Sequence, residues 1–147
     1  MNNKLLLTPS MEDYLESILK LEIINNNPKI KDIAKDLNVQ MPSVIGALKT
    51  LRGKELVIYK KNSNIQLTKK GKKIAITINE RHEAIAIFLH KIFLFSEKEA
   101  QETACKIEHV IKHETAKQFS NLTAYIDKNI IEKQITLDNW NKIINSD

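Results

Sequence analysis

Two short amphipathic segments, separated by a brief break, constrain the fold of this chain more than any other feature. They are KIKDIAKDLNV (residues 29–39) and MPSVIGALKTLRGKEL (residues 41–56), with the break around residues 38–40. Apolar residues recur in both at helical spacing: Ile30, Ile33, Ala34 and Leu37, then Val44, Ala47, Leu48 and Leu51. Two short helices joined by three or four residues form the pattern of a helix-turn-helix.

The flanking sequence extends this motif into a winged helix. A first helix is predicted from the start signal Thr8-Pro9-Ser10 to about Glu22. Two β-prone runs, residues 56–59 and 65–68, follow the second amphipathic segment and flank a polar turn, which predicts a hairpin. Three helices and then a hairpin account for residues 8–68 as a winged helix-turn-helix.

The rest of the chain is predicted to be helical. A long helix should span residues 69 to about 95, and Ser96 should cap another at residues 97–113. Residues 114–147 are predicted to form one or two amphipathic helices with these apolar residues on one side: Phe119, Leu122, Tyr125 and Ile126. We therefore expect a mainly α protein, with a DNA-binding domain at residues 1–74 and an all-helical domain at residues 75–147.

Charge is unevenly divided between these halves. Residues 1–74 contain 14 Lys and Arg against 7 Asp and Glu, whereas residues 75–147 contain 9 against 11. A basic first half suggests a module that binds a polyanion, although a solvated lysine-rich surface has the same composition. One cysteine and no long apolar run predict a cytoplasmic protein in a reducing compartment, without a membrane partner.

The second helix of a helix-turn-helix enters the DNA major groove. Residues at its start can read bases, while basic residues farther along and in the wing can hold phosphates. The candidate DNA-binding residues are Gln40, Met41, Pro42, Ser43, Gly46, Lys49, Arg52, Lys60 and Lys61. Close approach to DNA would explain Gly46, which is unfavourable inside a helix. A winged helix used for protein contacts is the alternative.

Candidate metal donors occur in three predicted helices. Cys105, Glu108 and His109 lie three and four residues apart, which places them on one helical face. Asp13 and Glu16 share a face of the first helix, and His82 lies in the long helix. Such donors can form a cage for a divalent first-row ion.

Each donor also has a structural interpretation. Cys105 can be a small buried hydrophobe, Glu108 can pair with Lys112, and Asp13 can belong to a capping box. A catalytic dyad of Cys105 and His109 is disfavoured because no Gly-rich turn or oxyanion donor lies nearby. We therefore expect no enzymatic activity.

The whole pattern resembles the metal-dependent repressors typified by the diphtheria toxin repressor and the manganese transport regulator. The resemblance is carried by residues 7–16 (LTPSMEDYLE), 30–39 (IKDIAKDLNV), 42–44 (PSV), 67–71 (LTKKG), 81–83 (RHE) and 104–109 (ACKIEH). It implies a winged helix, a helical dimerisation domain and a metal site. By position, the metal ligands fall on Asp13, Glu16, His82, Cys105, Glu108 and His109.

The resemblance mixes features of two branches of this family. Asp13 matches the manganese-type members, whereas Cys105 matches the iron-type members. Ala86 and Gln101 stand where the iron-type ancillary site needs a carboxylate and a histidine, so that site should be absent. Family members also often have Lys-Gly-Leu-Val after the recognition helix, where this chain has Lys54-Glu55-Leu56-Val57, and the usual wing glycine is missing.

The function implied is that of a homodimeric repressor on a palindromic operator. It would sense Mn(II) or Fe(II), with one or two ions per subunit, and control genes for metal uptake. The alternative is a metal-independent winged-helix regulator that responds to a small molecule or a redox signal through its helical domain. The two-domain layout fits the manganese-type members better.

Overall fold

The computed structural model describes residues 7–25, 28–60, 64–131 and 136–146 and confirms the mainly α fold class. The chain forms two compact units, Met1–Ile78 (unit 1) and Asn79–Asp147 (unit 2). The division between them falls within helix α4 (Lys69–Ile92). The domain boundary after residue 74 lies in the same helix and stays a prediction.

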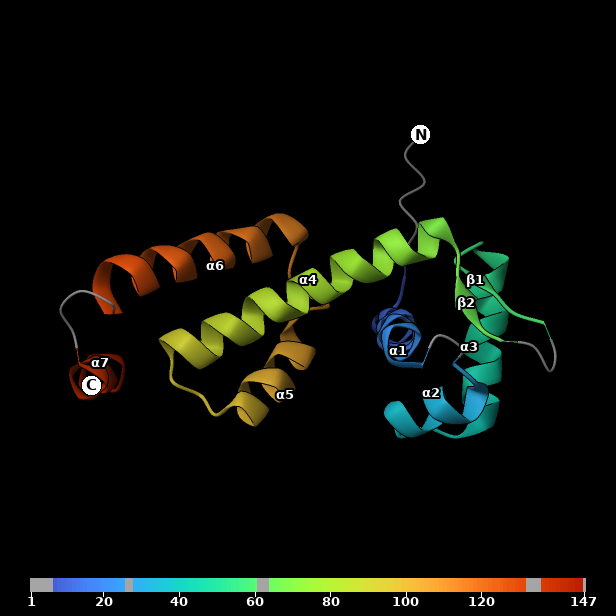
Figure 1. Cartoon of the computed structure of the whole chain (residues 1–147), viewed down its shortest axis with the longest axis horizontal. Coiled ribbons are helices and arrows are strands. Elements are labelled where there is room, and N and C mark those ends of the chain that lie inside the picture. Colours follow the sequence, from blue (N-terminus) through green and yellow to red (C-terminus); the bar gives the residue numbers. More distant parts are fainter. Residues whose placement is uncertain (1–6, 26–27, 61–63, 132–135, 147) are drawn as a thin grey trace. The chain divides into compact units, whose positions relative to one another are not determined.

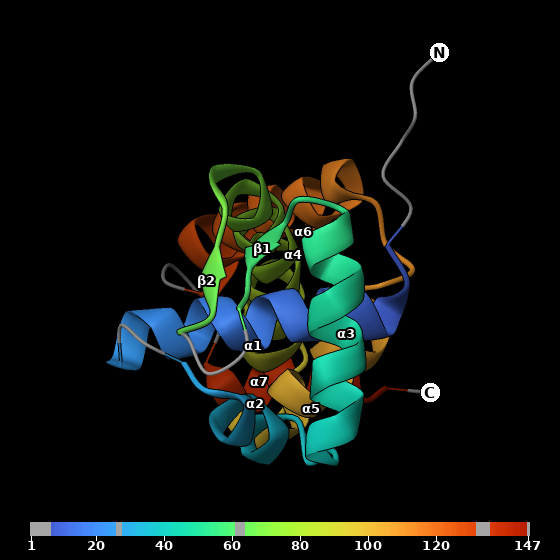
Figure 2. The ribbon, with the colours of Figure 1, turned by 90° about the vertical axis from the view of Figure 1, so that its right-hand side faces the viewer.

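Unit 1 has the element order of a winged helix-turn-helix, as predicted. It contains α1 (Pro9–Asn25), α2 (Ile30–Asp36), α3 (Met41–Gly53), β1 (Val57–Ile58), β2 (Gln66–Leu67) and the start of α4 (Figure 1). The two strands pair antiparallel, with Val57 opposite Leu67. In Figure 2 the hairpin lies beside α3, and α3 crosses in front of α1. Residues 61–63 of the wing lie outside the described part of the chain.

The core of unit 1 forms where the apolar stripes of its first three helices meet. Leu15 and Ile18 of α1, Ile33 of α2, and Val44 and Leu48 of α3 are all 0% exposed. Full burial of each such side chain contributes roughly 1.5–3 kcal/mol, whereas a helix cap contributes about 1 kcal/mol. The stripes therefore stabilise the unit more than any cap does.

Among the described residues of unit 1, Asn38 and Glu55 adopt left-handed backbone conformations. Asn38 (φ 52°) forms the turn between α2 and α3, and Glu55 (φ 61°) follows the end of α3. Around Glu55, the Leu56 amide donates to the Leu51 carbonyl at 2.9 Å and closes the helix end. Asn adopts this conformation with little strain, whereas Glu adopts it with steric strain. Glycine is the usual residue at such a helix end.

Gly71 permits the close approach of α4 to Leu56, the residue before β1. A Cβ atom at this position would lie 1.9 Å from the Leu56 carbonyl oxygen, so a larger residue would force the backbone apart. Thr68 reinforces the approach, because its hydroxyl accepts from the Gly71 amide at 3.0 Å and donates to the Glu55 carbonyl at 2.8 Å. The first turn of α4 is thus fixed against the winged helix.

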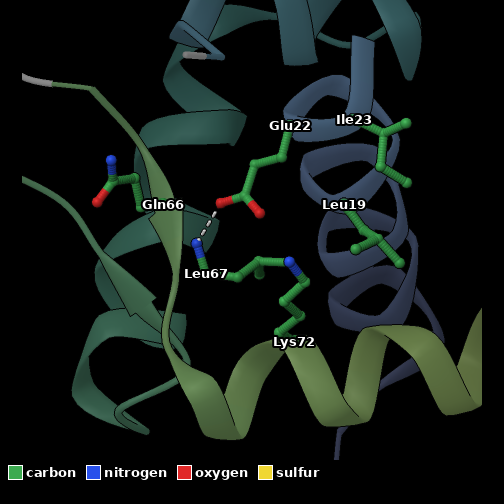
Figure 3. Close-up of a pocket in the computed structure, with 6 residues that line it drawn as sticks. All are labelled: Leu19, Glu22, Ile23, Gln66, Leu67 and Lys72. Carbon is green, nitrogen blue, oxygen red and sulfur yellow. Dashed lines mark hydrogen bonds between the residues drawn. The ribbon is translucent and has the colours of Figure 1, made fainter. Parts of the chain in front are cut away.

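A carboxylate of α1 holds the second strand of the wing. Glu22 Oε1 accepts a hydrogen bond from the Leu67 amide at 2.6 Å (Figure 3). A surface pocket of about 390 Å³ lies beside this bond, lined by Leu19, Glu22, Ile23, Gln66, Leu67 and Lys72. The bond ties β2 directly to α1.

Unit 2 contains the rest of α4, followed by α5 (Glu97–Ile107), α6 (His113–Ile126), a π-helical turn η1 (Asp127–Ile131) and α7 (Leu137–Ile144). In Figure 1, α5 and α6 lie along opposite sides of α4. Ile85 and Leu89 of α4 pack against α5, and Phe88 and Ile92 pack with Trp140 of α7. The Trp140 Nε1–H donates to the Ile92 carbonyl at 2.7 Å, which satisfies a carbonyl at the end of α4. Across the described residues, each helix is too short or too polar to span a bilayer.

The helical predictions for unit 2 need three corrections. The helix predicted at residues 97–113 ends at Ile107, because the chain turns at residues 108–111 and buries Glu108 completely. The long helix ends at Ile92 rather than near residue 95. On α6, Tyr125 (64%) and Leu122 (48%) are exposed, whereas Phe119 and Ile126 pack inward.

The start of α5 is fixed by a capping box, as predicted for Ser96. The Ser96 hydroxyl accepts from the Glu99 amide at 3.3 Å, and the Ser96 amide donates to Glu99 Oε2 at 3.1 Å. Hydrogen bonds from the Ser96 hydroxyl and amide lower the pKa of Glu99. A carboxylate that stays ionised here also complements the dipole of α5.

We expect Glu55→Gly to stabilise the protein by about 0.5–1 kcal/mol, because glycine adopts positive φ without steric strain. Urea unfolding followed by circular dichroism measures the change. Asn38→Gly is the matched control. Because Asn38 (φ 52°) already tolerates its conformation, this substitution should raise the free energy of unfolding much less. Equal effects of the two substitutions would contradict the assignment of strain to Glu55.

Candidate metal centre and nucleic-acid interface

The predicted DNA-binding residues lie on the surface of unit 1. Those exposed on or next to α3 are Gln40, Met41, Pro42, Ser43, Gly46, Lys49 and Arg52, and Lys60 is exposed at the end of the first wing strand. Lys61 lies outside the described residues. Because α3 buries Val44, Leu48 and Leu51, its opposite face is left for a ligand.

Gly46 lies in the middle of α3, on its exposed face. Among the described residues, no atom lies within 4 Å of a Cβ built at this position. Packing within the protein therefore gives no reason for a glycine here. Close approach of an external ligand stays a prediction that accounts for it.

Arg52 has a structural contact that the sequence did not predict. Its Nη1 donates to the Tyr59 carbonyl at 3.3 Å, which links the last turn of α3 to the wing. The guanidinium has five donors in a planar fork, so one bond leaves others available for a phosphate. Arg52 can therefore brace the wing and contact DNA at once.

The two acidic candidates of unit 1 lie one turn apart on α1. Asp13 and Glu16 are both half-buried, and they flank the buried residues Tyr14 and Leu15. Burial, with a smaller contribution from the Asp13 charge, raises the pKa of Tyr14. Tyr14 thus stays a neutral phenol at neutral pH.

In unit 2 the structure brings three predicted donors together. Glu108 is the C-cap residue of α5, and its Oε2 lies 2.7 Å from Nδ1 of His82 on α4. Its Oε1 lies 3.4 Å from Nε2 of the adjacent His109. The carboxylate therefore lies between two imidazole rings.

Glu108 is a fully buried acidic residue with two imidazole neighbours. It is 0% exposed, and Oε1 accepts no hydrogen bond from the described residues. A buried carboxylate is stabilised by close polar or cationic partners or by a metal ion. Carboxylate oxygen and imidazole nitrogen are ligands for divalent first-row metals, so these three residues fit such an ion.

Gln101 is a neighbour of this site whose role sequence reasoning missed. Its Oε1 lies 2.5 Å from Nε2 of His82, on the opposite edge of the ring from Glu108. The sequence indicated only that Gln101 replaces a histidine of the iron-type members. No local signal could reveal its contact with a residue of another helix.

Cys105 is placed differently from the other candidates of unit 2. Its side chain is exposed, although Glu108, one turn later, is fully buried. Glu108 keeps helical dihedral angles (φ −55°, ψ −34°), and its amide donates to the Ala104 carbonyl at 2.9 Å. The shared helical face of Cys105, Glu108 and His109 stays a prediction. The thiol nevertheless remains accessible to a metal or an oxidant.

The comparisons with known proteins cover both units. Residues 6–65 match the N-terminal DNA-binding domain of the iron-dependent repressors, and residues 68–137 match their metal-binding and dimerisation domain. The HTH-type transcriptional regulator MntR of Bacillus subtilis is 34% identical over 127 residues, which cover 86% of this chain and 89% of that protein. An uncharacterised HTH-type transcriptional regulator of Methanocaldococcus jannaschii is 38% identical over 109 residues, covering 74% of this chain and 87% of that protein.

A solved structure of the manganese regulator SloR is similar in fold and sequence. It superposes with a TM-score of 0.70 at 29% identity and covers 81% of this chain. This chain spans 55% of the length of that one. The chain therefore belongs to the family of metal-dependent, DNA-binding repressors that includes the diphtheria toxin repressor and the manganese transport regulator.

Proposed function

We propose that this metal-dependent repressor senses Mn(II) or Fe(II) and shuts off genes for metal uptake when the ion is plentiful. The observation that carries the proposal is the fully buried Glu108 carboxylate, set between the imidazoles of His82 and His109. A bound ion supplies the positive charge that this carboxylate requires. The names of the manganese regulators similar to this chain favour the same class of ion.

The proposed ligand set draws on both units. Asp13 and Glu16 would contribute from unit 1, and His82, Cys105, Glu108 and His109 from unit 2. Three carboxylates and two imidazoles favour Mn(II) or Fe(II), whereas the thiol favours softer or later metals. The number of oxygen donors leads us to place Mn(II) and Fe(II) ahead of Zn(II), with one or two ions per subunit.

Regulation would follow from ligands shared between the units. Donors that meet around one ion restrict the relative motion of the elements that carry them. Metal would then bind more tightly to the DNA-competent state and shift the population toward it. A tenfold preference for that state corresponds to about 1.4 kcal/mol of coupling.

The protein acts as a homodimer on DNA, so each operator half-site meets one copy of α3. We assign base contacts to Gln40 and Ser43, and phosphate contacts to Lys49, Arg52 and Lys60.

Unit 2 exposes the apolar side chains of Val110 (82%) and Tyr125 (64%). We expect part of this apolar surface to be covered in the dimer.

The metal-independent alternative is not favoured. It would need a binding pocket among the long helices, and unit 2 has one of about 340 Å³ lined by residues of α4 and α6. Exposed Glu80, Glu83 and Lys117 contribute to that lining, and nothing in it selects a particular small molecule. The match to the metal-binding domain of the repressors outweighs this pocket.

Asp13→Ala and His109→Ala should each abolish the Mn(II)-dependent gain in operator affinity, since each removes a proposed ligand. Gel-shift titrations with and without Mn(II), and after chelation, measure the effect. His90→Ala is the matched control, because Nδ1 of the His90 ring lies 2.8 Å from the nearby Phe95 carbonyl and His90 is outside the proposed ligand set. A full metal response in both ligand variants would rule out this site.

Cys105→Glu should move metal preference toward Mn(II) and away from Zn(II), because a hard carboxylate replaces a soft thiolate. Competition titrations with the two ions measure the ratio of their dissociation constants, with Cys105→Ser as the control for loss of the thiol alone. An unchanged ratio in both variants would show that Cys105 is not a ligand.

Gly46→Ala should raise stability and weaken operator binding at once. Alanine favours an exposed helix interior by about 1 kcal/mol over glycine, and nothing in the described structure obstructs its methyl group. If α3 approaches DNA closely at this position, that methyl group clashes with the operator. Thermal unfolding and gel-shift assays test both effects. Unchanged operator affinity would show that DNA does not approach Gly46.

A further inference from the structure

We infer that Gln101 is a positioning residue of the metal site, because it fixes the tautomer and the orientation of the His82 ring. The inference rests on the proposed assignment of His82 as a metal ligand. It concerns a residue that the resemblance leaves without a role, since Gln101 occupies a position where iron-type members have a histidine.

The geometry of His82 carries the inference. Its two ring nitrogens face two oxygen atoms, one from the middle of α5 and one from its C-cap residue: Nε2 lies 2.5 Å from Gln101 Oε1, and Nδ1 lies 2.7 Å from Glu108 Oε2. The ring is itself half-buried, with its side chain 15% exposed. The imidazole is therefore held at both edges.

These contacts have different chemical consequences. An amide oxygen and a carboxylate oxygen both only accept, so either ring nitrogen can donate when no metal is bound. When Nδ1 serves as a metal ligand, the proton of the neutral ring lies on Nε2 and is donated to Gln101 Oε1. The Nδ1 lone pair then points at the Glu108 carboxylate. In the proposed site, that lone pair and the Glu108 carboxylate would both serve as ligands of one ion.

The same arrangement matches the general behaviour of metal-binding histidines. A ligating imidazole donates its second N–H to an oxygen acceptor, which sets the ring orientation and supports metal affinity. Gln101 is the acceptor here. Because its amide is neutral, it directs the proton without adding a negative charge to the site.

Gln101→Leu removes the acceptor at nearly constant size, and Gln101→Glu retains it. Gln118→Leu, the same change at an exposed position of α6, is the matched control. Isothermal titration of the full-length protein with Mn(II) measures affinity. Nitrogen chemical shifts of the His82 ring in Zn(II)-loaded protein report the tautomer, with His82→Asn used to assign the signals.

We expect Gln101→Leu to weaken Mn(II) binding by about tenfold and to remove the single Nε2–H tautomer of His82. Gln101→Glu should bind Mn(II) at least as tightly as the native protein, and Gln118→Leu should change neither measurement. Native affinity together with a native tautomer in Gln101→Leu would overturn the inference, as would equal weakening by Gln101→Glu.

Failure of this inference can be told apart from failure of the proposed function. His82→Ala should reduce Mn(II) affinity more than Gln101→Leu does. If His82→Ala weakens binding and Gln101→Leu does not, only the role of Gln101 is wrong. If neither variant weakens binding, His82 is not a ligand and the proposed metal site is wrong as well.

Discussion

The buried carboxylate of Glu108 is the interaction on which unit 2 depends. Removal of such a charge from water is unfavourable by several kcal/mol unless close partners offset it. The partners are His82, brought by α4, and His109, the next residue in the chain. In the proposed metal site, the same carboxylate would also bind the cation, which would link the stability of unit 2 to sensing.

Most of the fold could be predicted because its signals are local. Apolar periodicity and two short β-prone runs each lie within one element and specify the three helices and the wing of unit 1, and the capping Ser96 marks the start of α5 in unit 2. The end of α5 could not be predicted in this way. Residues 108–112 (EHVIK) contain neither glycine nor proline, so the turn there depends on the tertiary burial of Glu108.

In the candidate site, too, local features could be predicted from the sequence and long-range contacts could not. Its donors could be proposed from spacing and resemblance, because Glu108 and His109 are neighbours in the sequence. The residues that support the site and the wing could not be proposed from the sequence. Gln101 lies 19 residues from its partner His82, and Glu22 lies 45 residues from its partner Leu67. A single sequence carries no signal for such pairs.

The hydrogen bond between Trp140 and the Ile92 carbonyl has a practical consequence. The chain contains one tryptophan, and its indole is 8% exposed at the junction of α4 and α7. Intrinsic tryptophan emission from this protein therefore arises from a single fluorophore in the helical half. A change in this emission on ligand addition would report directly a change in the packing of α7 against α4, without any attached dye.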